Sequence, residues 1–293
     1  PTWFKKEGIL YPIGLSMEQC SSEFTAKYKK KLCKGEKFID LTGGFGVDTY
    51  FISKSFKESI YCELNSDLQK ITEHNFSILK TNIKSLNNDG LKYLKKTNEK
   101  FDLIYIDPSR RSQENKKVIE LKQYTPNILN YLELLFKKGK NILLKTSPYL
   151  DIKRVLNQLY NVESVHVLTV NKECKEVLYL LNEKRKRDPI IHCIDITKKL
   201  KFNFTFKEEE NICNITQPLK YLYEPNAAIL KAGGFNSIGN SFQIKKLHTN
   251  SHLYTSNELI DNFPGRRFII EKITKLNNKD ITQMLPDKKA NIT

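Results

Sequence analysis

The sequence predicts an α/β protein built on a doubly wound, mainly parallel sheet and followed by a small α+β appendage. Strand-like apolar runs alternate with helix-like stretches through the first 180 residues, as right-handed βαβ units do. The stretch "DLTGGFGVD" (40–48) places three glycines directly behind an apolar run. The charged run "NEKRKRDP" (182–189) then ends the alternation, which indicates a boundary.

Each element follows from the local pattern of apolar residues. The expected strands are short apolar runs near 37–42, 59–63, 83–87, 101–106, 140–146, 163–170 and 175–181. The expected helices are the longer stretches at 17–33, 46–56, 65–80, 89–96, 121–137 and 149–160.

The last two of these strands are predicted to form a hairpin. Only residues 171–174 separate them, which is too short for a crossover helix. One strand of the otherwise parallel sheet should therefore be antiparallel.

The remaining residues change in character. "KFNFTF" (201–206) has the period of a strand, "KAGGFNSIGNSF" (231–242) is a glycine-rich turn region, and "DNFPGRRFIIEKI" (261–273) leads from a turn into a strand. These signals predict the small α+β appendage.

Composition narrows the class of protein. A net charge of +16 over 293 residues favours an anionic partner such as nucleic acid. The six cysteines show no C-x-x-C spacing, so we expect reduced thiols in a cytoplasmic protein and no metal site. No apolar run is long enough to predict a membrane span.

The glycine loop disfavours a dinucleotide ligand. The nicotinamide fingerprint G-x-G-x-x-G expects a third glycine that "GGFGVD" lacks. Asp48 would also repel a pyrophosphate at the start of the following helix.

S-adenosylmethionine (SAM) carries no phosphate and suits the same loop. Asp40 at the strand end can take its ammonium, and a glycine backbone lets its methionine and ribose portions approach. Glu63 ends the next strand, where an acid can grip ribose hydroxyls, and Asp89 follows the third strand, where it can meet adenine. The candidate cofactor-binding residues are Asp40, Thr42, Gly43, Gly44, Gly46, Glu63, Leu64, Asp89 and Gly90.

The candidate catalytic residues are Asp107, Pro108 and Arg110 in "FDLIYIDPSRR" (101–111). Asp107 ends the fourth strand, where it could orient the nucleophile or accept its proton, while Pro108 stiffens the exit. Methyl transfer by in-line displacement depends mostly on alignment. The alternative is an ordinary Asp-Pro turn.

Two further positions border this region. Ser22, Thr25 or Lys29 on the helix before the first strand could close over the methionine carboxylate, or that helix could be a simple cover. Lys145, at the end of the fifth strand, could meet an RNA phosphate or remain solvated.

Together these stretches carry a family resemblance. "FIDLTGGFGVDTYFIS", "YCELN", "NNDG" and "YIDPSRR" resemble motifs I to IV of class I SAM-dependent methyltransferases. "LSMEQCSSEFTAKYKK" (15–30), "YLYEPNAAILKAGGF" (221–235), "LHTNSHLYTS" (247–256) and "FPGRRF" (263–268) resemble one bacterial family within that class. Its members carry a ferredoxin-like insert and a THUMP-like C-terminal domain.

The resemblance implies a Rossmann-like, seven-stranded sheet in the order 3-2-1-4-5-7-6 with an antiparallel last strand. It implies SAM as cofactor and a nucleobase of rRNA or tRNA as substrate. It divides the chain into a methyltransferase domain with an N-terminal cover helix (1–182), a small ferredoxin-like region (183–261) and the start of a truncated THUMP-like domain (262–293).

One departure from the pattern keeps other functions open. Enzymes that methylate exocyclic amines of bases commonly read Asp/Asn-Pro-Pro-aromatic, with the aromatic stacked on a flipped base. Here Ser109 and Arg110 occupy the last two places, although Arg110 could stack or hold a phosphate. The alternatives are an RNA-binding module that keeps SAM without catalysis, and a methyltransferase acting on a small molecule or protein.

Overall fold

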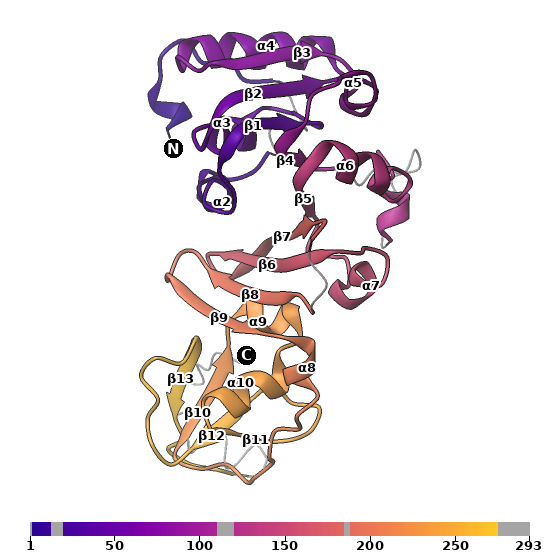
Figure 1. Ribbon diagram of the computed structural model, residues 1–293. Coiled ribbons are helices and arrows are strands. Elements are labelled where there is room, and N and C mark those ends of the chain that lie inside the picture. Colours follow the sequence, from indigo (N-terminus) through magenta and orange to yellow (C-terminus); the bar gives the residue numbers. More distant parts are fainter. Residues whose placement is uncertain (1, 13–19, 110–119, 185–187, 275–293) are drawn as a thin grey trace. The chain divides into compact units, whose positions relative to one another are not determined.

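A computed structural model describes residues 2–12, 20–109, 120–184 and 188–274. Its main feature is a sheet of nine strands in the order β3-β2-β1-β4-β5-β7-β6-β8-β9 (Figure 1). The strands are β1 (Gly35–Asp40), β2 (Phe56–Glu63), β3 (Ile83–Asn87), β4 (Phe101–Ile106), β5 (Gly139–Thr146), β6 (Val162–Val170), β7 (Glu173–Asn182), β8 (Ile190–Asp195) and β9 (Leu200–Phe204).

The seven expected strands and their expected order are confirmed. Strands β1 to β5 pair in parallel, whereas β7 pairs antiparallel with both β5 and β6. The β6–β7 hairpin turns through Asn171 and Lys172, whose φ angles are 52° and 69°. Positive φ at both central residues matches the twist of the flanking strands, so this short link forms a tight turn.

Two more strands extend the sheet beyond the expected seven. β8 pairs in parallel with β6, and β9 pairs antiparallel with β8. The strand predicted from "KFNFTF" therefore exists, but it lies in the main sheet and not in the appendage. Its alternation explains this position, because Phe202 and Phe204 are buried while Lys201 and Asn203 are exposed.

Helices cover this sheet on both faces (Figure 1). They are α2 (Glu23–Lys29), α3 (Val47–Ser53), α4 (Ser66–Ile78), α5 (Gly90–Lys96), α6 (Leu132–Lys138), α7 (Ile152–Leu156), α8 (Phe206–Glu209) and α9 (Ala227–Ala232), with the 3-10 turn η1 (Trp3–Lys5). Helix α2 begins at Glu23 because the Ser22 side chain accepts a hydrogen bond from the Thr25 amide and so caps the helix.

The expected helix over 121–137 is broken. It is replaced by η2 (Leu121–Gln123), η3 (Ile128–Tyr131) and α6. Pro126 supplies the reason, because it lacks an amide hydrogen and disfavours helical backbone at Thr125. Thr125 instead forms a β-bridge with Ser109.

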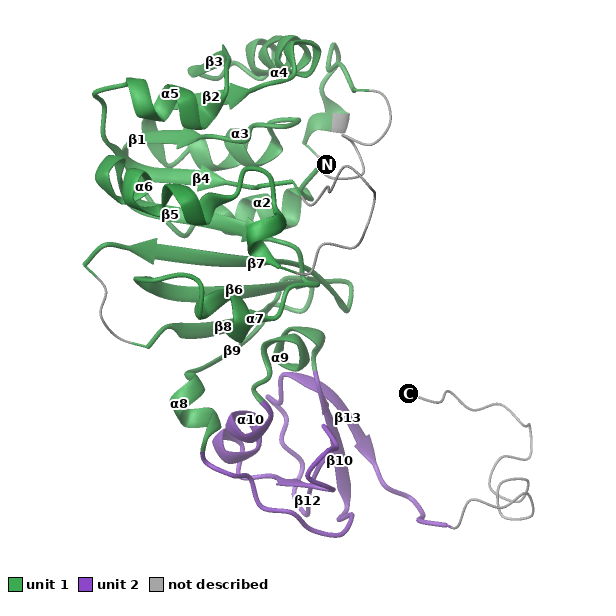
Figure 2. Ribbon diagram, turned by 90° about the vertical axis from the view of Figure 1, so that its right-hand side faces the viewer, with its two compact units in different colours: residues 1–210, 226–234 green, residues 211–225, 235–293 purple. Residues whose placement is uncertain are grey.

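The chain forms two compact units (Figure 2). Unit 1 contains residues 1–210 and 226–234, so helix α9 returns to it and packs against β6, β7 and β8. Unit 2 contains residues 211–225 and 235–293. It holds the antiparallel sheet β11-β12-β10-β13, made of β10 (Tyr221–Pro225), β11 (Lys245–Lys246), β12 (Tyr254–Ser256) and β13 (Gly265–Ile269), and helix α10 (Phe235–Ser241).

These compact units are defined by contacts within the structure, whereas the expected domains are defined by family membership. The expected division of the chain at 182/183 and 261/262 therefore stays a prediction.

Among the described residues, none of the helices is long and apolar enough to cross a lipid bilayer.

Candidate functional site

Three acidic residues meet at one edge of the large sheet. β1 pairs in parallel with β2 on one side and with β4 on the other, so their carboxyl ends lie together. Asp40 ends β1, Glu63 ends β2, and Asp107 follows β4. We call this place the carboxyl edge; in doubly wound sheets it is where ligands bind.

Two glycines shape the loop that leaves β1. A Cβ on Gly43 would lie 2.1 Å from the Tyr61 ring, so only glycine lets the loop pack on β2. Gly44 has φ +54°, and a Cβ there would approach only the Thr42 carbonyl, at 3.9 Å. The backbone at Gly44 therefore borders open space that a side chain would fill, as close approach of a ligand to a backbone requires.

The Asp40 carboxylate lies beneath this loop and is buried. One oxygen accepts the Thr42 amide at 2.9 Å, and the other accepts the Thr49 hydroxyl at 2.6 Å. Burial raises the pKa of Asp40 to about 7, against the lowering effect of these two bonds. Both carboxylate oxygens thus bond within the first βα unit.

Glu63 links β2 to the same loop. Its Oε2 accepts the Gly44 amide at 2.8 Å, and its Oε1 accepts the Asn65 amide at 2.8 Å. The side chain of its neighbour Leu64 is 71% exposed. An acid beside an exposed apolar residue suits a sugar joined to a flat, apolar base.

The third strand reaches the edge through Asp89 and Gly90. Asp89 caps α5, since its Oδ1 accepts the amides of Leu91 and Lys92 at 2.9 and 3.1 Å. A Cβ on Gly90 would lie 2.3 Å from the Leu41 carbonyl oxygen. Glycine at this position therefore holds the start of α5 against the end of β1.

Asp107 is fixed from both its backbone and its carboxylate. Its amide donates to the Thr42 hydroxyl at 2.7 Å, and its Oδ2 forms an ion pair with Lys145. Pro108 is buried, and Ser109 is exposed but exchanges two backbone hydrogen bonds with Thr125. Arg110 lies outside the described residues.

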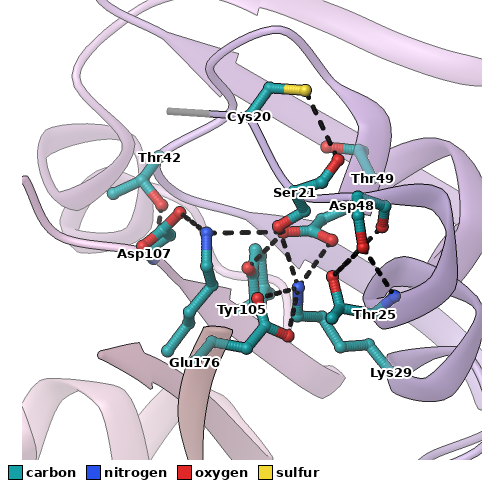
Figure 3. Close-up of polar contacts among 12 residues, drawn as sticks. Cys20, Ser21, Thr25, Lys29, Thr42, Asp48, Thr49, Tyr105, Asp107 and Glu176 are labelled. Atoms are coloured by element: carbon teal, nitrogen blue, oxygen red, sulfur yellow. Dashed lines mark hydrogen bonds and ion pairs between the residues drawn. The ribbon is translucent and has the colours of Figure 1, made fainter. Parts of the chain in front are cut away.

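Behind this edge lies a group that we call the buried charge cluster: four acidic or basic side chains and one phenol, from Lys29, Asp48, Lys145, Glu176 and Tyr105. Figure 3 labels all of them except Lys145. Lys29 Nζ lies 2.8 Å from Asp48 Oδ1 and 2.9 Å from Glu176 Oε2. The Tyr105 hydroxyl donates to Asp48 Oδ2 at 2.6 Å. Five elements (α2, α3, β4, β5 and β7) each contribute one member.

The charges in this cluster perturb one another. Burial alone would raise the pKa of Asp48, but Lys29 and Lys145 outweigh it and lower the pKa to about 2. Burial by itself would lower the pKa of Lys145, but the neighbouring carboxylates of Asp107 and Asp48 outweigh it. The pKa of Lys145 is therefore raised. Burial raises the pKa of Glu176.

The cluster changes the interpretation of Lys29. Its side chain is fully buried between two carboxylates, so it is not free to close over a methionine carboxylate, which was one of the two alternatives for this helix. Sequence reasoning overlooked the cluster, although Asp48 lies inside "GVDTYFIS" and Glu176 directly precedes the apolar run "VLYLL". Charged residues inside such stretches are a signal of buried ion pairs.

A doubly wound sheet with an antiparallel β7, a glycine loop after β1 and acids after β1, β2 and β4 defines the class I methyltransferase fold. The family model described as conserved hypothetical protein 95 matches residues 22–150, and a ferredoxin-like domain model matches residues 221–264.

Relatives agree with this class. A crystal structure from Porphyromonas gingivalis W83, named "putative methyltransferase", is 32% identical, covers 98% of this chain and 74% of that one, and has a TM-score of 0.89. A Mycoplasma mobile protein named "Uncharacterized RNA methyltransferase MMOB5020" is 27% identical over 58% of this chain. The chain spans 50% of the length of that curated relative. The chain belongs to the bacterial class I methyltransferase family that carries a ferredoxin-like domain.

Replacing Lys29 with methionine should strongly destabilise unit 1. The change leaves two buried carboxylates without their shared cation, which typically costs about 3–5 kcal/mol. Urea unfolding measures the loss. Lys27→Met is the matched control on the same helix; its 56% exposed side chain pairs with Glu23, and its loss should stay below about 1 kcal/mol. Equal losses in the two variants would refute the buried role.

The raised pKa of Asp40 predicts a pH-dependent effect of Asp40→Asn. The stability that Asp40 contributes is fully present below its unfolded pKa near 4 and is lost as pH rises through about 7. The free energy of unfolding of the variant minus that of wild type should therefore rise by about 2–4 kcal/mol between pH 4 and 8. Urea titrations across this range measure it, and a flat or falling difference would contradict the account.

Proposed function

We propose that this protein is a SAM-dependent methyltransferase that acts on RNA, with a nucleobase of rRNA or tRNA as its target. One observation carries the proposal: the open space at Gly44 adjoins Glu63 and lies at the same edge as Asp107. This arrangement supports three roles at one edge: a loop whose backbone a ligand could approach, an acid that would bind its sugar, and an acid that would lie at the reacting end.

The cofactor would lie across the end of β1. Glu63 would bind the ribose hydroxyls, exposed Leu64 would cover the adenine, and Asp89 would meet its polar edge. Asp40 would support the loop from below, because it is buried and bonds to Thr42 and Thr49, whereas Glu63 is only partly buried. When bound, SAM supplies an electrophilic methyl group; the remaining cofactor contacts would come from Thr42, Gly43, Gly44, Gly46 and Gly90.

Asp107 would organise the acceptor. Because its backbone is tied to Thr42 and its carboxylate to Lys145, it can hold a nucleophile with little loss of entropy. Pro108 would keep the chain in place, and Arg110 would stack on a base or hold a phosphate.

RNA is the proposed partner for two reasons. A net charge of +16 favours a polyanion. The Mycoplasma mobile relative also bears an RNA methyltransferase name. We further propose a cytoplasmic location, and a ferredoxin-like region followed by the start of a THUMP-like domain that presents the RNA.

A second candidate is a module that binds SAM and RNA without methyl transfer. One observation favours it: the carbonyl of Ser109 accepts the Thr125 amide at 3.0 Å and is thus engaged, where amine methyltransferases use motif IV carbonyls to hold the amine. A methyltransferase acting on a small molecule or protein is a third.

Two substitutions separate cofactor binding from transfer. Glu63→Ala should weaken binding of S-adenosylhomocysteine about 10- to 100-fold, since a hydrogen bond to a charged group contributes about 1.5–3 kcal/mol. Asp107→Ala should keep that affinity but lower methyl transfer at least about 100-fold. Calorimetry measures binding, and labelled SAM with total RNA from a deletion strain measures transfer.

Glu58→Ala is the matched control, because Glu58 lies on the same strand with a side chain 67% exposed and far from the carboxyl end. It should behave as wild type in both assays. Binding without label in RNA would favour the module, and label in protein or small molecules would favour the third candidate. Unchanged transfer by Asp107→Ala would remove its proposed role.

A further inference from the structure

Lys145 lies where β5 reaches the carboxyl edge, and its side chain is only 12% exposed. Its Nζ forms an ion pair with Asp107 Oδ2 and lies 4.0 Å from Asp48 Oδ2. A lysine that binds RNA phosphate needs an ammonium open to solvent. Lys145 instead has its ammonium enclosed between two carboxylates.

The charges along this line alternate in sign. Glu176 pairs with Lys29, Lys29 with Asp48, Asp48 lies beside Lys145, and Lys145 pairs with Asp107. Of these five side chains, Asp107 is the most exposed, at 33%. A buried series of charges therefore ends in the one carboxylate that lies at the proposed reaction site.

The members behind Lys145 are themselves held in place. Ser21, Tyr105 and Lys29 all contact the carboxylate of Asp48 at 2.6–2.8 Å (Figure 3). Asp48 therefore has little freedom to move toward or away from Lys145. Asp48 in turn lies beside Lys145, which pairs with the carboxylate of Asp107. The backbone of Asp107 is held separately by the Thr42 hydroxyl.

Lys145 is also the cation that offsets the acids around Asp107. The ionisable groups that interact with Asp107 are Lys145 from β5, Asp40 from β1 and Tyr105 from β4. Lys145 is the cation among these three, and its Nζ also lies 4.0 Å from Asp48 Oδ2. One ammonium therefore offsets the negative charge of both Asp107 and Asp48.

We propose that Lys145 is a positioning residue that anchors one oxygen of Asp107, so that its other oxygen faces the acceptor. The proposal rests on the proposed function and deepens it, because a carboxylate held in this way recognises an acceptor that carries N–H or O–H. The acceptor atom forms a bond to the methyl carbon as the carbon–sulfur bond breaks, the electron pair stays on sulfur, and the acceptor proton passes to Asp107 and then to solvent.

The test follows the Asp107 carboxyl directly. Three-bond coupling constants from NMR of the full chain without cofactor give the χ1 rotamer of Asp107, with the signals assigned through Asp107→Asn. Wild type should hold one rotamer, whereas Lys145→Met should average over several, because the carboxylate loses its anchor. Lys145→Arg should restore the single rotamer, and Lys145→Gln repeats the charge removal with a polar side chain in case the methionine variant does not fold.

Lys175→Met is the matched control, because Lys175 pairs with Glu173 at an exposed position of β7. It should leave the single rotamer of Asp107 unchanged. In transfer assays, Lys145→Met should lower kcat at least about 10-fold, because the acceptor loses its alignment. Its KM for SAM and its affinity for S-adenosylhomocysteine should stay within about threefold of wild type, because Lys145 contacts the acid and not the proposed cofactor site.

A single, unchanged Asp107 rotamer in Lys145→Met and Lys145→Gln would overturn the proposal, as would loss of RNA affinity with an unchanged kcat, which marks a phosphate contact. If wild type labels no RNA while the rotamer of Asp107 averages in Lys145→Met, the proposed function fails and the positioning by Lys145 stands. If wild type labels RNA while the rotamer does not change, the positioning by Lys145 fails and the proposed function stands.

Discussion

The need to compensate buried charge shapes unit 1 more than any other constraint. Lys29 and Asp48 lie inside a core of apolar strands and helices, where an isolated charge would be very costly. Their mutual contacts, together with Glu176, join α2, α3 and β7. These ion pairs thus hold helix α2 against the sheet. Removing one partner would be strongly destabilising, because it leaves the remaining charges buried without compensation.

This cluster and the glycine loop converge on the same edge of the sheet. The loop after β1 packs on β2 through Gly43 and opens at Gly44, while the helix that follows carries Asp48 into the cluster. Thr42 in this loop bonds to Asp40 and to the backbone of Asp107. Asp107 in turn pairs with Lys145 of the cluster, so the loop and the cluster are linked through Asp107. One short segment therefore shapes the proposed cofactor site, supports the proposed catalytic acid and anchors the core behind it.

Local patterns in the sequence predicted much of this arrangement. The strands, the β6–β7 hairpin and the position of Glu63 and Asp89 at strand ends follow from periodicity and loop length, which are properties of neighbouring residues. The strand order was instead implied by the family resemblance. The ion pairs of Lys29 could not be predicted from local patterns, because its partner Glu176 lies 147 residues away. The place of β8 and β9 in the main sheet depends on the pairing of β8 with β6, which the charged run 182–189 between them does not reveal.

The central claim is that a sulfonium nucleoside binds at the carboxyl ends of β1, β2 and β4. A crystal structure of this chain grown with S-adenosylhomocysteine tests it most directly. The account predicts the ribose hydroxyls on the carboxylate of Glu63, the amino acid portion along Gly44, and the sulfur directed toward Asp107. A ligand bound elsewhere, or a carboxyl edge closed to it at saturating concentration, would contradict the account.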